Sequence, residues 1–253
     1  MEAGGLSIYM FSVCAFATLS WHPSSPIGQF IAGAMPRRIF MGLGTGTTLI
    51  AIRMSPWGKQ SGGHLNPAIT LAFYRLGKLD LSDTLFYCAG QFLGALTGVA
   101  VASYLLGGTL GNAAVHYGVT APGAYGDAVA FVAEVIISFA LMATILSVSE
   151  RENLSRYTPY FASALVAACT AFESPLSGSS ANPARTFGPA IVASYWHALW
   201  IYFTAPPFGM LAAAEAFLIL RGGVGPFCAK LHHANHKRCI FHHGYRTVFT
   251  FFG

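Results

Sequence analysis

Charged residues are scarce in this chain. Asp, Glu, Lys and Arg make up 9% of its 253 residues, whereas an average soluble domain carries about 25%. So few charges cannot keep a globule of this size in solution, and they are too few for a nucleic-acid module that relies on many phosphate contacts. With 54% hydrophobic residues, the chain also lacks the composition of a disordered segment. The composition therefore predicts an integral membrane protein whose partner is the lipid bilayer, with no nucleic-acid partner.

Cysteine is also sparse, and its spacing is irregular. Cys14, Cys88 and Cys169 lie inside apolar runs, which is typical of buried free thiols. The five cysteines therefore predict no disulfide framework.

Long apolar runs mark helices that can cross a bilayer core about 30 Å thick. The sequence predicts six spans: Gly4–Trp21, Ile39–Met54, Leu85–Leu106, Val129–Val148, Tyr157–Phe172 and Trp196–Leu220. Two shorter apolar segments, Pro67–Leu76 and Pro183–Tyr195, cannot cross alone, and each begins with Asn-Pro-Ala. Short segments at matching places in two halves indicate a pore or a binding site.

The spans divide into two equivalent halves. Each half, 1–106 and 129–221, has three spans, with one short segment between its second and third spans. Because three is odd, the second half must start from the opposite face of the membrane, so the halves form an inverted repeat. The predicted fold is an all-α membrane protein of six transmembrane helices plus two re-entrant half-helices. An outer loop at 107–128 connects the halves, and a cytoplasmic tail follows at 222–253.

Basic residues are distributed unequally between the loops. The outer loops hold Arg37 and Arg38, and Arg53 lies near the inner end of the second span. With both termini inside, the cytoplasmic side holds Lys59, Arg75, Lys78, Arg151, Arg156, Arg221, Lys230, Lys237, Arg238 and Arg246. Because an excess of Lys and Arg marks cytoplasmic loops, we expect both termini in the cytoplasm and an inner or plasma membrane location.

The two Asn-Pro-Ala tripeptides predict two helix starts. Pro suits the first helical position because its φ is already helical and it has no N–H to leave unpaired, and Asn66 or Asn182 before it is a good N-cap. In an inverted repeat the half-helices meet near the midplane with their positive dipole ends facing. A cation or a hopping proton is repelled there, whereas a neutral molecule is not. The preceding loops, 61–64 and 177–180, can offer carbonyl acceptors to a file of water.

These features resemble the aquaporin, or major intrinsic protein, family across nearly the whole chain. The resemblance is carried by the segments SGGHLNPAIT (61–70) and SGSSANPARTFGPA (177–190), together with Glu2 and Glu134. It implies a passive channel rather than an enzyme, with no required cofactor, that assembles as a homotetramer with one pore in each subunit. It also implies that Glu2 and Glu134 anchor the re-entrant loops by accepting backbone N–H bonds.

The resemblance assigns roles to four pore residues. Asn66 and Asn182 correspond to the paired signature asparagines, and Arg185 corresponds to the filter arginine. In such channels an arginine and the half-helix dipoles exclude protons and cations. His64 corresponds to a loop histidine, which either supports the loop or helps to line the pore.

The selectivity filter departs from that of strict water channels, which combine an aromatic residue with a His. Counting back from Asn182 without gaps gives Thr170 and Ser179. The loop before the first Asn-Pro-Ala is longer than usual, so we predict Thr45 in the second span, with Gly46 or Leu43 as alternatives. Together with the filter arginine, these small hydroxyl residues predict a wider but still polar filter.

Other positions distinguish this chain from the glycerol-conducting members of the family. Those members resemble one another in an Asp after the filter arginine and a basic residue four positions later, where this chain has Thr186 and Ala190. In the sixth span, Tyr202-Phe203 replaces a Pro and an aliphatic residue. The second Asn-Pro-Ala segment is closer to plant nodulin-like and some bacterial members, whose cargoes are more varied.

The tail is rich in residues that bind metal ions. Its candidate ligands are Cys228, His232, His233, His236, Cys239, His242 and His243. Thiolate and imidazole suit zinc or another borderline divalent metal, although this spacing is not that of a standard zinc finger. The alternative is a basic tail attracted to anionic lipid.

The predicted function is a passive channel for water, and for small neutral solutes, that excludes protons and ions. One alternative is a channel mainly for a small neutral solute such as glycerol, urea, ammonia, hydrogen peroxide or a metalloid acid. A coupled secondary transporter also uses inverted repeats and broken helices, but it needs an acidic or cation-coordinating residue beside them. A metalloenzyme built on the tail lacks a zinc-protease motif or another plausible base.

Overall fold

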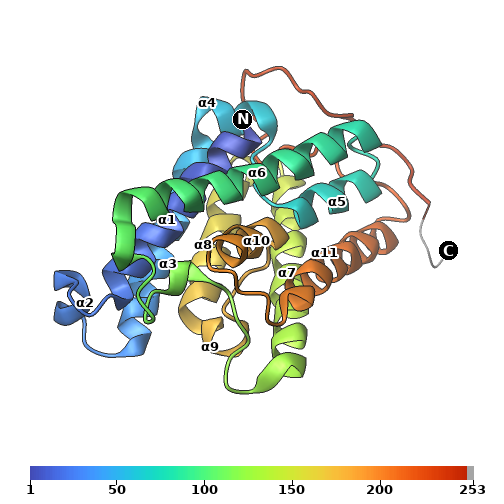
Figure 1. Ribbon diagram of the computed structural model, residues 1–253. Coiled ribbons are helices and arrows are strands. Elements are labelled where there is room, and N and C mark those ends of the chain that lie inside the picture. The colour runs from blue at the N-terminus through green and yellow to red at the C-terminus, as the bar shows by residue number, and fades with distance from the viewer. Residues whose placement is uncertain (250–253) are drawn as a thin grey trace.

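The structure is a computed structural model that describes residues 1–249. The longer helices are α1 (Glu2–Trp21), α3 (Ala34–Met54), α6 (Leu81–Leu106), α7 (Gly126–Ser149), α8 (Thr158–Phe172) and α11 (Leu199–Leu220). The shorter ones are α2 (Pro26–Phe30), α4 (Pro56–Ser61), α5 (Pro67–Arg75), α9 (Ser174–Ser177) and α10 (Pro183–Val192). Three 3-10 turns lie at Gly107–Thr109, His116–Gly118 and Ser155–Tyr157. These helices pack side by side around the two half-helices α5 and α10 (Figure 1).

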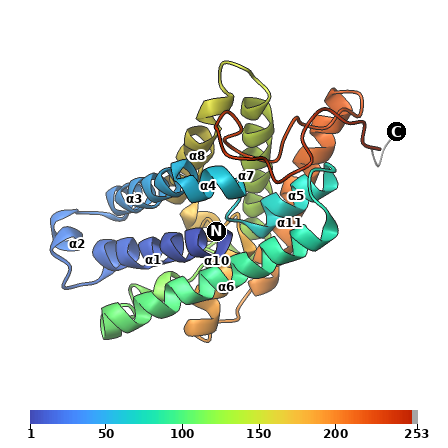
Figure 2. The same cartoon turned by 90° about the horizontal axis from the view of Figure 1, so that it is seen from above.

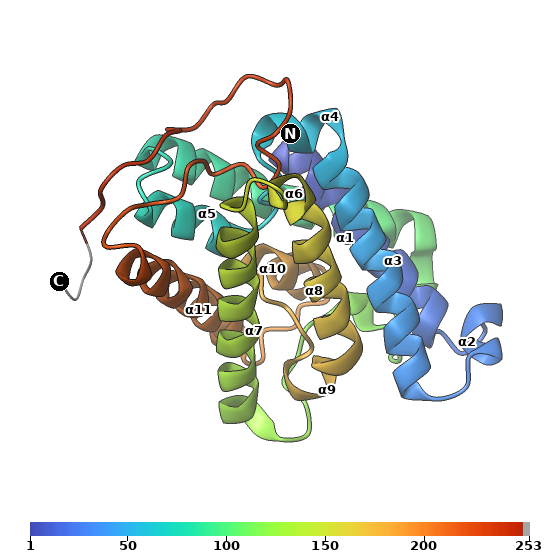
Figure 3. The same ribbon diagram turned by 180° about the vertical axis from the view of Figure 1, so that it is seen from behind.

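Four helices in the described part of the chain are long and apolar enough to cross a membrane: α1, α6, α7 and α11. The predicted second and fifth spans correspond to α3 and α8, which differ from this pattern. α3 has 21 residues, a length of roughly 31 Å, but it carries Arg37, Arg38 and Arg53. α8 has 15 residues and is followed at once by α9 (Figure 3). After α9 the chain enters the loop that leads to the second Asn-Pro-Ala. Both helices are therefore held in position by packing against their neighbours more than by their own hydropathy.

The two halves repeat one packing pattern. α1 packs on α6 and α3, α7 packs on α11 and α8, and the halves meet where α3 contacts α8. Glycines allow the closest approaches, since a Cβ at Gly94 or Gly98 of α6 would lie 2.2 or 2.3 Å from a carbonyl oxygen of α1. In the second half, a Cβ at Gly209 of α11 would lie 2.4 Å from a carbonyl oxygen of α7. Small residues at such crossings are what lets helices pack closely in a bilayer.

The half-helices cross over between the repeats. α5 belongs to the first half but packs on α11, and α10 belongs to the second half but packs on α6. Both lie in the interior between the long helices (Figure 2). α5 begins at Pro67 and α10 begins at Pro183, as the Asn-Pro-Ala tripeptides predict. The exchange fastens the halves together at the centre of the molecule.

The two ends of the helical bundle are covered by different segments. The connecting loop, between α6 and α7, packs on α1 through the buried Leu110 and Val115. After α11 the tail runs back across the other end, where the N-terminus and α4 also lie (Figures 1 and 3). Tail residues Ala229, Leu231 and Phe241 are buried in the same core as α5. The tail is thus part of the fold.

Candidate pore

The two signature asparagines hold the half-helices together. Asn66 Oδ1 accepts a 2.9 Å bond from the N–H of Ala68 in its own helix, while its Nδ2 donates to the Ala181 carbonyl at 2.7 Å. Asn182 caps α10 in the same way, and its Nδ2 donates to the Leu65 carbonyl at 2.9 Å. Each amide therefore caps one helix and binds the loop of the other. An NH₂ group has two hydrogens, so each asparagine keeps a second donor for a molecule in the pore.

The loops before the half-helices have matching backbone shapes. Gly62 and Gly178 have φ of 95° and 80°, and Leu65 and Ala181 have φ of 53° and 47°. Left-handed backbone is costly for residues with a side chain, so it persists only where other contacts enforce it. The same sequence of turns in both loops places the carbonyls of Leu65 and Ala181 opposite the asparagine amides.

Two buried carboxylates provide those contacts. One Glu2 oxygen lies 2.6 Å from the N–H of Leu65, and one Glu134 oxygen lies 2.7 Å from the N–H of Ala181. Each also contacts the serine hydroxyl that begins its loop, Ser61 at 2.6 Å and Ser177 at 2.7 Å; the Ser177 hydroxyl lies at 2.6 Å from a Glu173 oxygen as well, so the two carboxylates share its hydrogen. Each carboxylate therefore holds its loop at the left-handed residue that precedes the asparagine.

Arg185 lines a vestibule of about 340 Å³ at the end of the bundle that the connecting loop covers, which is the end predicted to face outward and is called the outer vestibule below. Its Nη1 donates to the Gly118 carbonyl at 3.2 Å and to the Thr120 hydroxyl, both in the connecting loop. Thr170 and Met41 line the same vestibule. The connecting loop thus holds the guanidinium in place, and the charge lines a space large enough for several water molecules.

Thr45 and Thr170 lie at the level between two cavities. Met41 lines the outer vestibule and Leu49 lines a central cavity, so Thr45, one turn from each, lies between them on α3. Its hydroxyl donates to the Met41 carbonyl at 2.9 Å. Similarly, Thr170 lines the vestibule and Val166, one turn before it, lines the central cavity.

Ser179 occupies the same level on the second loop. Its neighbour Gly178 lines the vestibule, and Ser180 lines the central cavity. The Ser179 N–H donates to the Ser177 hydroxyl at 3.1 Å. Of the four predicted filter residues, Thr170 and Arg185 line the vestibule, whereas Thr45 and Ser179 line neither cavity and lie next to residues that do. Met41 also lines the vestibule, which the sequence did not indicate.

The central cavity lies at the junction of the half-helices. It measures about 20 Å³ and is lined by both asparagines, Tyr9, His64 and Arg53, among other residues. A cavity of this size holds about one water molecule. His64 is fully buried, and because a carbonyl can only accept, its Nε2 donates to the Ala229 carbonyl at 2.9 Å.

Comparison with known proteins agrees with this geometry. The family model of the major intrinsic proteins matches residues 4–217. Aquaporin NIP1-3 of Oryza sativa subsp. japonica is 37% identical over 165 residues, 65% of this chain and 56% of the relative's length. The probable aquaporin TIP4-1 of the same plant is 31% identical over 83% of this chain and 84% of its own length.

The chain belongs to the major intrinsic protein family. The solved aquaglyceroporin from Plasmodium falciparum has the same fold, with a TM-score of 0.69 at 19% identity, over 85% of this chain and 92% of that one. The prediction of an all-α inverted repeat is confirmed, and so is the resemblance to plant-type members. Members of this family are integral membrane channels and not enzymes. The chain spans a little over half the length of the rice NIP1-3 protein.

Arg53 is a pore residue whose role the sequence did not reveal. It is 3% exposed, and its Nε donates to the Gly63 carbonyl at 3.2 Å while its Nη1 donates to the Ser163 hydroxyl at 2.9 Å. Within residues 1–249 it forms no ion pair with a carboxylate. Arg53 continues the i, i+4 spacing of Met41, Thr45 and Leu49 along α3, and this spacing is the sequence signal for its position.

The tail groups three of its seven candidate metal ligands. The ligand atoms of Cys228, His233 and Cys239 all lie within 4.8 Å of one another. The two sulfur atoms are 3.4 Å apart, and all five cysteines are free. His242 instead lies 3.1 Å from Asp80, and the cluster does not include His232, His236 or His243. Burial raises the pKa of the Cys228 thiol well above its ordinary value.

Proposed function

We propose that this chain conducts water and at least one small neutral solute passively while it excludes protons and ions. The observation that carries the proposal is the pair of opposed, Asn-capped half-helices whose amides bind each other's loops. Their positive ends and the buried Arg185 repel a cation, since helix dipoles and fixed guanidinium groups act strongly where water is scarce. A neutral molecule meets carbonyl acceptors and amide donors instead.

The breadth of the cargo follows from the filter of Thr45, Thr170, Ser179 and Arg185. None of these four side chains is an aromatic ring or an imidazole. Thr45 and Thr170 donate their hydroxyl hydrogens to backbone carbonyls of their own helices, so their oxygens are left to accept from a polyol or urea, which offsets part of the solute's lost hydration. A channel mainly for such a solute is the second candidate, and the names of the plant relatives do not distinguish the two.

A coupled secondary transporter is less well supported. The carboxylates nearest the Asn-capped ends of the half-helices, Glu2 and Glu134, each accept three hydrogen bonds, all from the loops except the one that Gln91 of α6 donates to Glu2. A carboxylate engaged in this way cannot also coordinate a driving ion without releasing its loop.

Osmotic shrinkage of proteoliposomes in a stopped-flow instrument tests the proposal. Water permeability above that of empty vesicles is expected, together with uptake of glycerol, urea, ammonia or hydrogen peroxide. A pyranine assay under a pH gradient should detect no proton entry. Vesicles that pass protons would overturn the exclusion mechanism, and vesicles closed to every solute would overturn the wide filter.

We also propose the assembly and placement of the chain. The repeats 1–106 and 129–221, joined by 107–128 and followed by the tail 222–253, form one pore of a homotetramer in an inner or plasma membrane, with both termini in the cytoplasm. Side chains exposed on α6, such as Phe86 (79%) and Leu93 (62%), are suited to contact lipid or a neighbouring subunit. Light scattering in detergent and protease access to the tail in right-side-out vesicles test these points.

The last part of the proposal concerns the tail. Cys228, His233 and Cys239 bind a divalent metal ion, with Zn²⁺ favoured by two thiolates and one imidazole. The channel needs no such ion for conduction. Metal analysis of protein purified without a His-tag tests this site, and the alternative of a lipid-attracted tail predicts no stoichiometric metal.

A further inference from the structure

The tail lies directly against the loop that carries the first Asn-Pro-Ala. The Ala229 carbonyl accepts the 2.9 Å bond from His64, and the Leu231 N–H donates to the Gly62 carbonyl at 3.1 Å. The Phe241 ring stacks on the His64 ring at 5.5 Å with an interplanar angle of 11°. One pore-lining side chain and one loop carbonyl are therefore bound by the tail.

This contact leaves the two ends of the pore unlike each other. The outer end opens into the vestibule of about 340 Å³, whereas at the inner end the tail lies against the loop before Asn66. At the inner side of the central cavity His64 is fully buried and Arg53 is 3% exposed. The tail crosses the bundle at this end (Figure 2). In this conformation the tail covers the inner end of the pore.

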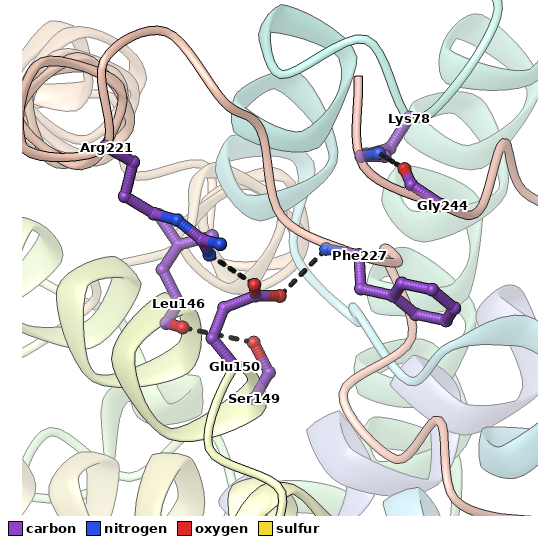
Figure 4. Close-up of polar contacts among 7 residues, drawn as sticks. All are labelled: Lys78, Leu146, Ser149, Glu150, Arg221, Phe227 and Gly244. Atoms are coloured by element: carbon purple, nitrogen blue, oxygen red, sulfur yellow. Dashed lines mark hydrogen bonds and ion pairs between the residues drawn. The ribbon is translucent and has the colours of Figure 1, made fainter. Parts of the chain in front are cut away.

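Two sets of polar contacts fasten the ends of the covering segment. Glu150 accepts a 2.8 Å bond from the Phe227 N–H and also pairs with Arg221. Lys78 donates to the Gly244 carbonyl at 2.8 Å. Figure 4 shows the contacts of Glu150 and that of Lys78 on opposite sides of the tail segment that carries Phe227. They hold residues 227 and 244, but they do not fix the loop between them.

The loop between these anchors closes on itself at the thiol cluster. Lys230 is 2% exposed, and its Nζ donates to the carbonyls of Lys237 and Arg238, each at 3.0 Å. This reversal brings Cys239 back to Cys228, and it brings His233 within reach of both. A cavity of about 350 Å³ reaches Cys228 and His233, so an ion and a water molecule as fourth ligand have access.

We propose that a divalent metal ion at Cys228, His233 and Cys239 locks residues 228–239 over the inner end of the pore, so that the metal closes the channel. The inference rests on the proposed metal site and adds its effect on conduction. A ligand that binds one conformation alone favours it by the factor 1 + [L]/Kd, about 100-fold at 100 times Kd. The ion would displace two thiol protons to solvent, and no oxidation is involved.

The experiment measures binding and conduction separately on the full chain. Proteoliposomes with the tail facing the bath are assayed for water permeability in buffered Zn²⁺ and then in chelator, and bound zinc is determined on the same protein. In the wild type we expect one equivalent of zinc and a several-fold lower permeability in Zn²⁺. The variants His233→Ala and Cys228→Ser/Cys239→Ser should bind less and keep the permeability seen in chelator. His236→Ala, an exposed tail histidine outside the cluster, is the matched control and should behave as wild type.

The outcomes separate the proposals. Zinc bound at one equivalent with unchanged permeability overturns the closure and leaves the metal site intact. No bound zinc overturns both, and no permeability above empty vesicles in any condition overturns the channel itself. If permeability falls with a thiol oxidant but not with Zn²⁺, a Cys228–Cys239 disulfide closes the pore and the metal proposal is wrong. Phe241→Ala removes the ring over His64 without touching a ligand, so it should raise permeability in Zn²⁺; an unchanged value contradicts the covering role.

Discussion

Replacing Glu134 by Gln should destabilise the chain more than the same change at Glu2. The Oε1 atom of Glu134 accepts bonds from the Ser177 hydroxyl and the Ser180 N–H, and its Oε2 accepts from the Ala181 N–H, each at 2.7 Å. A Gln amide has one acceptor oxygen and one NH₂ group. Whichever way the amide is turned, its NH₂ faces one of the two backbone N–H groups, and that donor loses its partner.

Glu2 offers an arrangement that Gln can satisfy. Its Oε1 contacts the Ser61 hydroxyl at 2.6 Å, and its Oε2 accepts from the Leu65 N–H and from Gln91 Nε2 at 2.6 and 2.8 Å. A hydroxyl can accept as well as donate, so an NH₂ group in the place of Oε1 donates to Ser61. All the backbone donors of this loop then keep their acceptor.

The difference in stability between the two variants follows from one backbone N–H that loses its acceptor. Both lose a buried negative charge, which largely cancels in the comparison, and Glu134→Gln alone leaves a buried N–H unsatisfied at about 1–3 kcal/mol. Because Ala181 also presents its carbonyl to Asn66, water permeability should fall more in this variant too. Thermal unfolding of the purified variants, followed by proteoliposome shrinkage, measures both effects. Equal losses, or a larger loss for Glu2→Gln, would refute the reasoning.

Three further predictions concern the pore. Arg185→Val should admit cations, because a cation about 4 Å from the guanidinium is repelled by about 4 kcal/mol at an effective dielectric constant of about 20. Vesicle current under a K⁺ gradient measures this, and a variant that carries no K⁺ current would contradict it. Thr45→Phe combined with Thr170→His should lower the ratio of glycerol to water flux about tenfold or more, because each change adds bulk to the filter; an unchanged ratio in stopped-flow would show that these residues do not form it. Arg53→Met should raise proton entry most clearly in the Arg185→Val background, and identical pyranine traces there would exclude a role for the inner cation.

The half-helices were predictable because local chemistry alone determines where they begin. Asn followed by Pro supplies a cap and a preset φ, and α5 and α10 begin at the predicted residues, Pro67 and Pro183. The same capping chemistry marks two short helices that apolar runs do not predict. α2 and α4 each begin at the proline of a Ser-Pro pair, and the serine is the N-cap. In both, the serine hydroxyl accepts a bond from a glycine N–H three residues later, at 3.2 Å. They were missed because a search for apolar runs passes over helices of one or two turns.

The tail could not be read from its spacing. Seven Cys and His residues within a short segment allow many ligand sets, and which side chains converge depends on where the backbone reverses. That reversal is set by Lys230, whose buried ammonium binds two carbonyls of the returning strand of chain. A lysine used in this way has no sequence signature, since most lysines are exposed. The role of Arg53 was unpredictable for a similar reason, because the contacts that hold this buried charge come from tertiary packing.

The asymmetry of the pore assigns different tasks to its two ends. At the outer end Arg185 and Thr170 line the vestibule, so we expect changes there to alter one permeant relative to another. At the inner end the tail binds His64 and the Gly62 carbonyl without contributing to the filter. If the tail closes each pore completely or not at all, it changes water and solute fluxes by the same factor, which is the fraction of open pores. A central cavity of about 20 Å³ lies in series with both, and fluxes through barriers in series fall together when any one is closed. A change in the ratio of solute to water flux therefore reports on the filter, whereas a change of both fluxes at a constant ratio reports on closure by the tail.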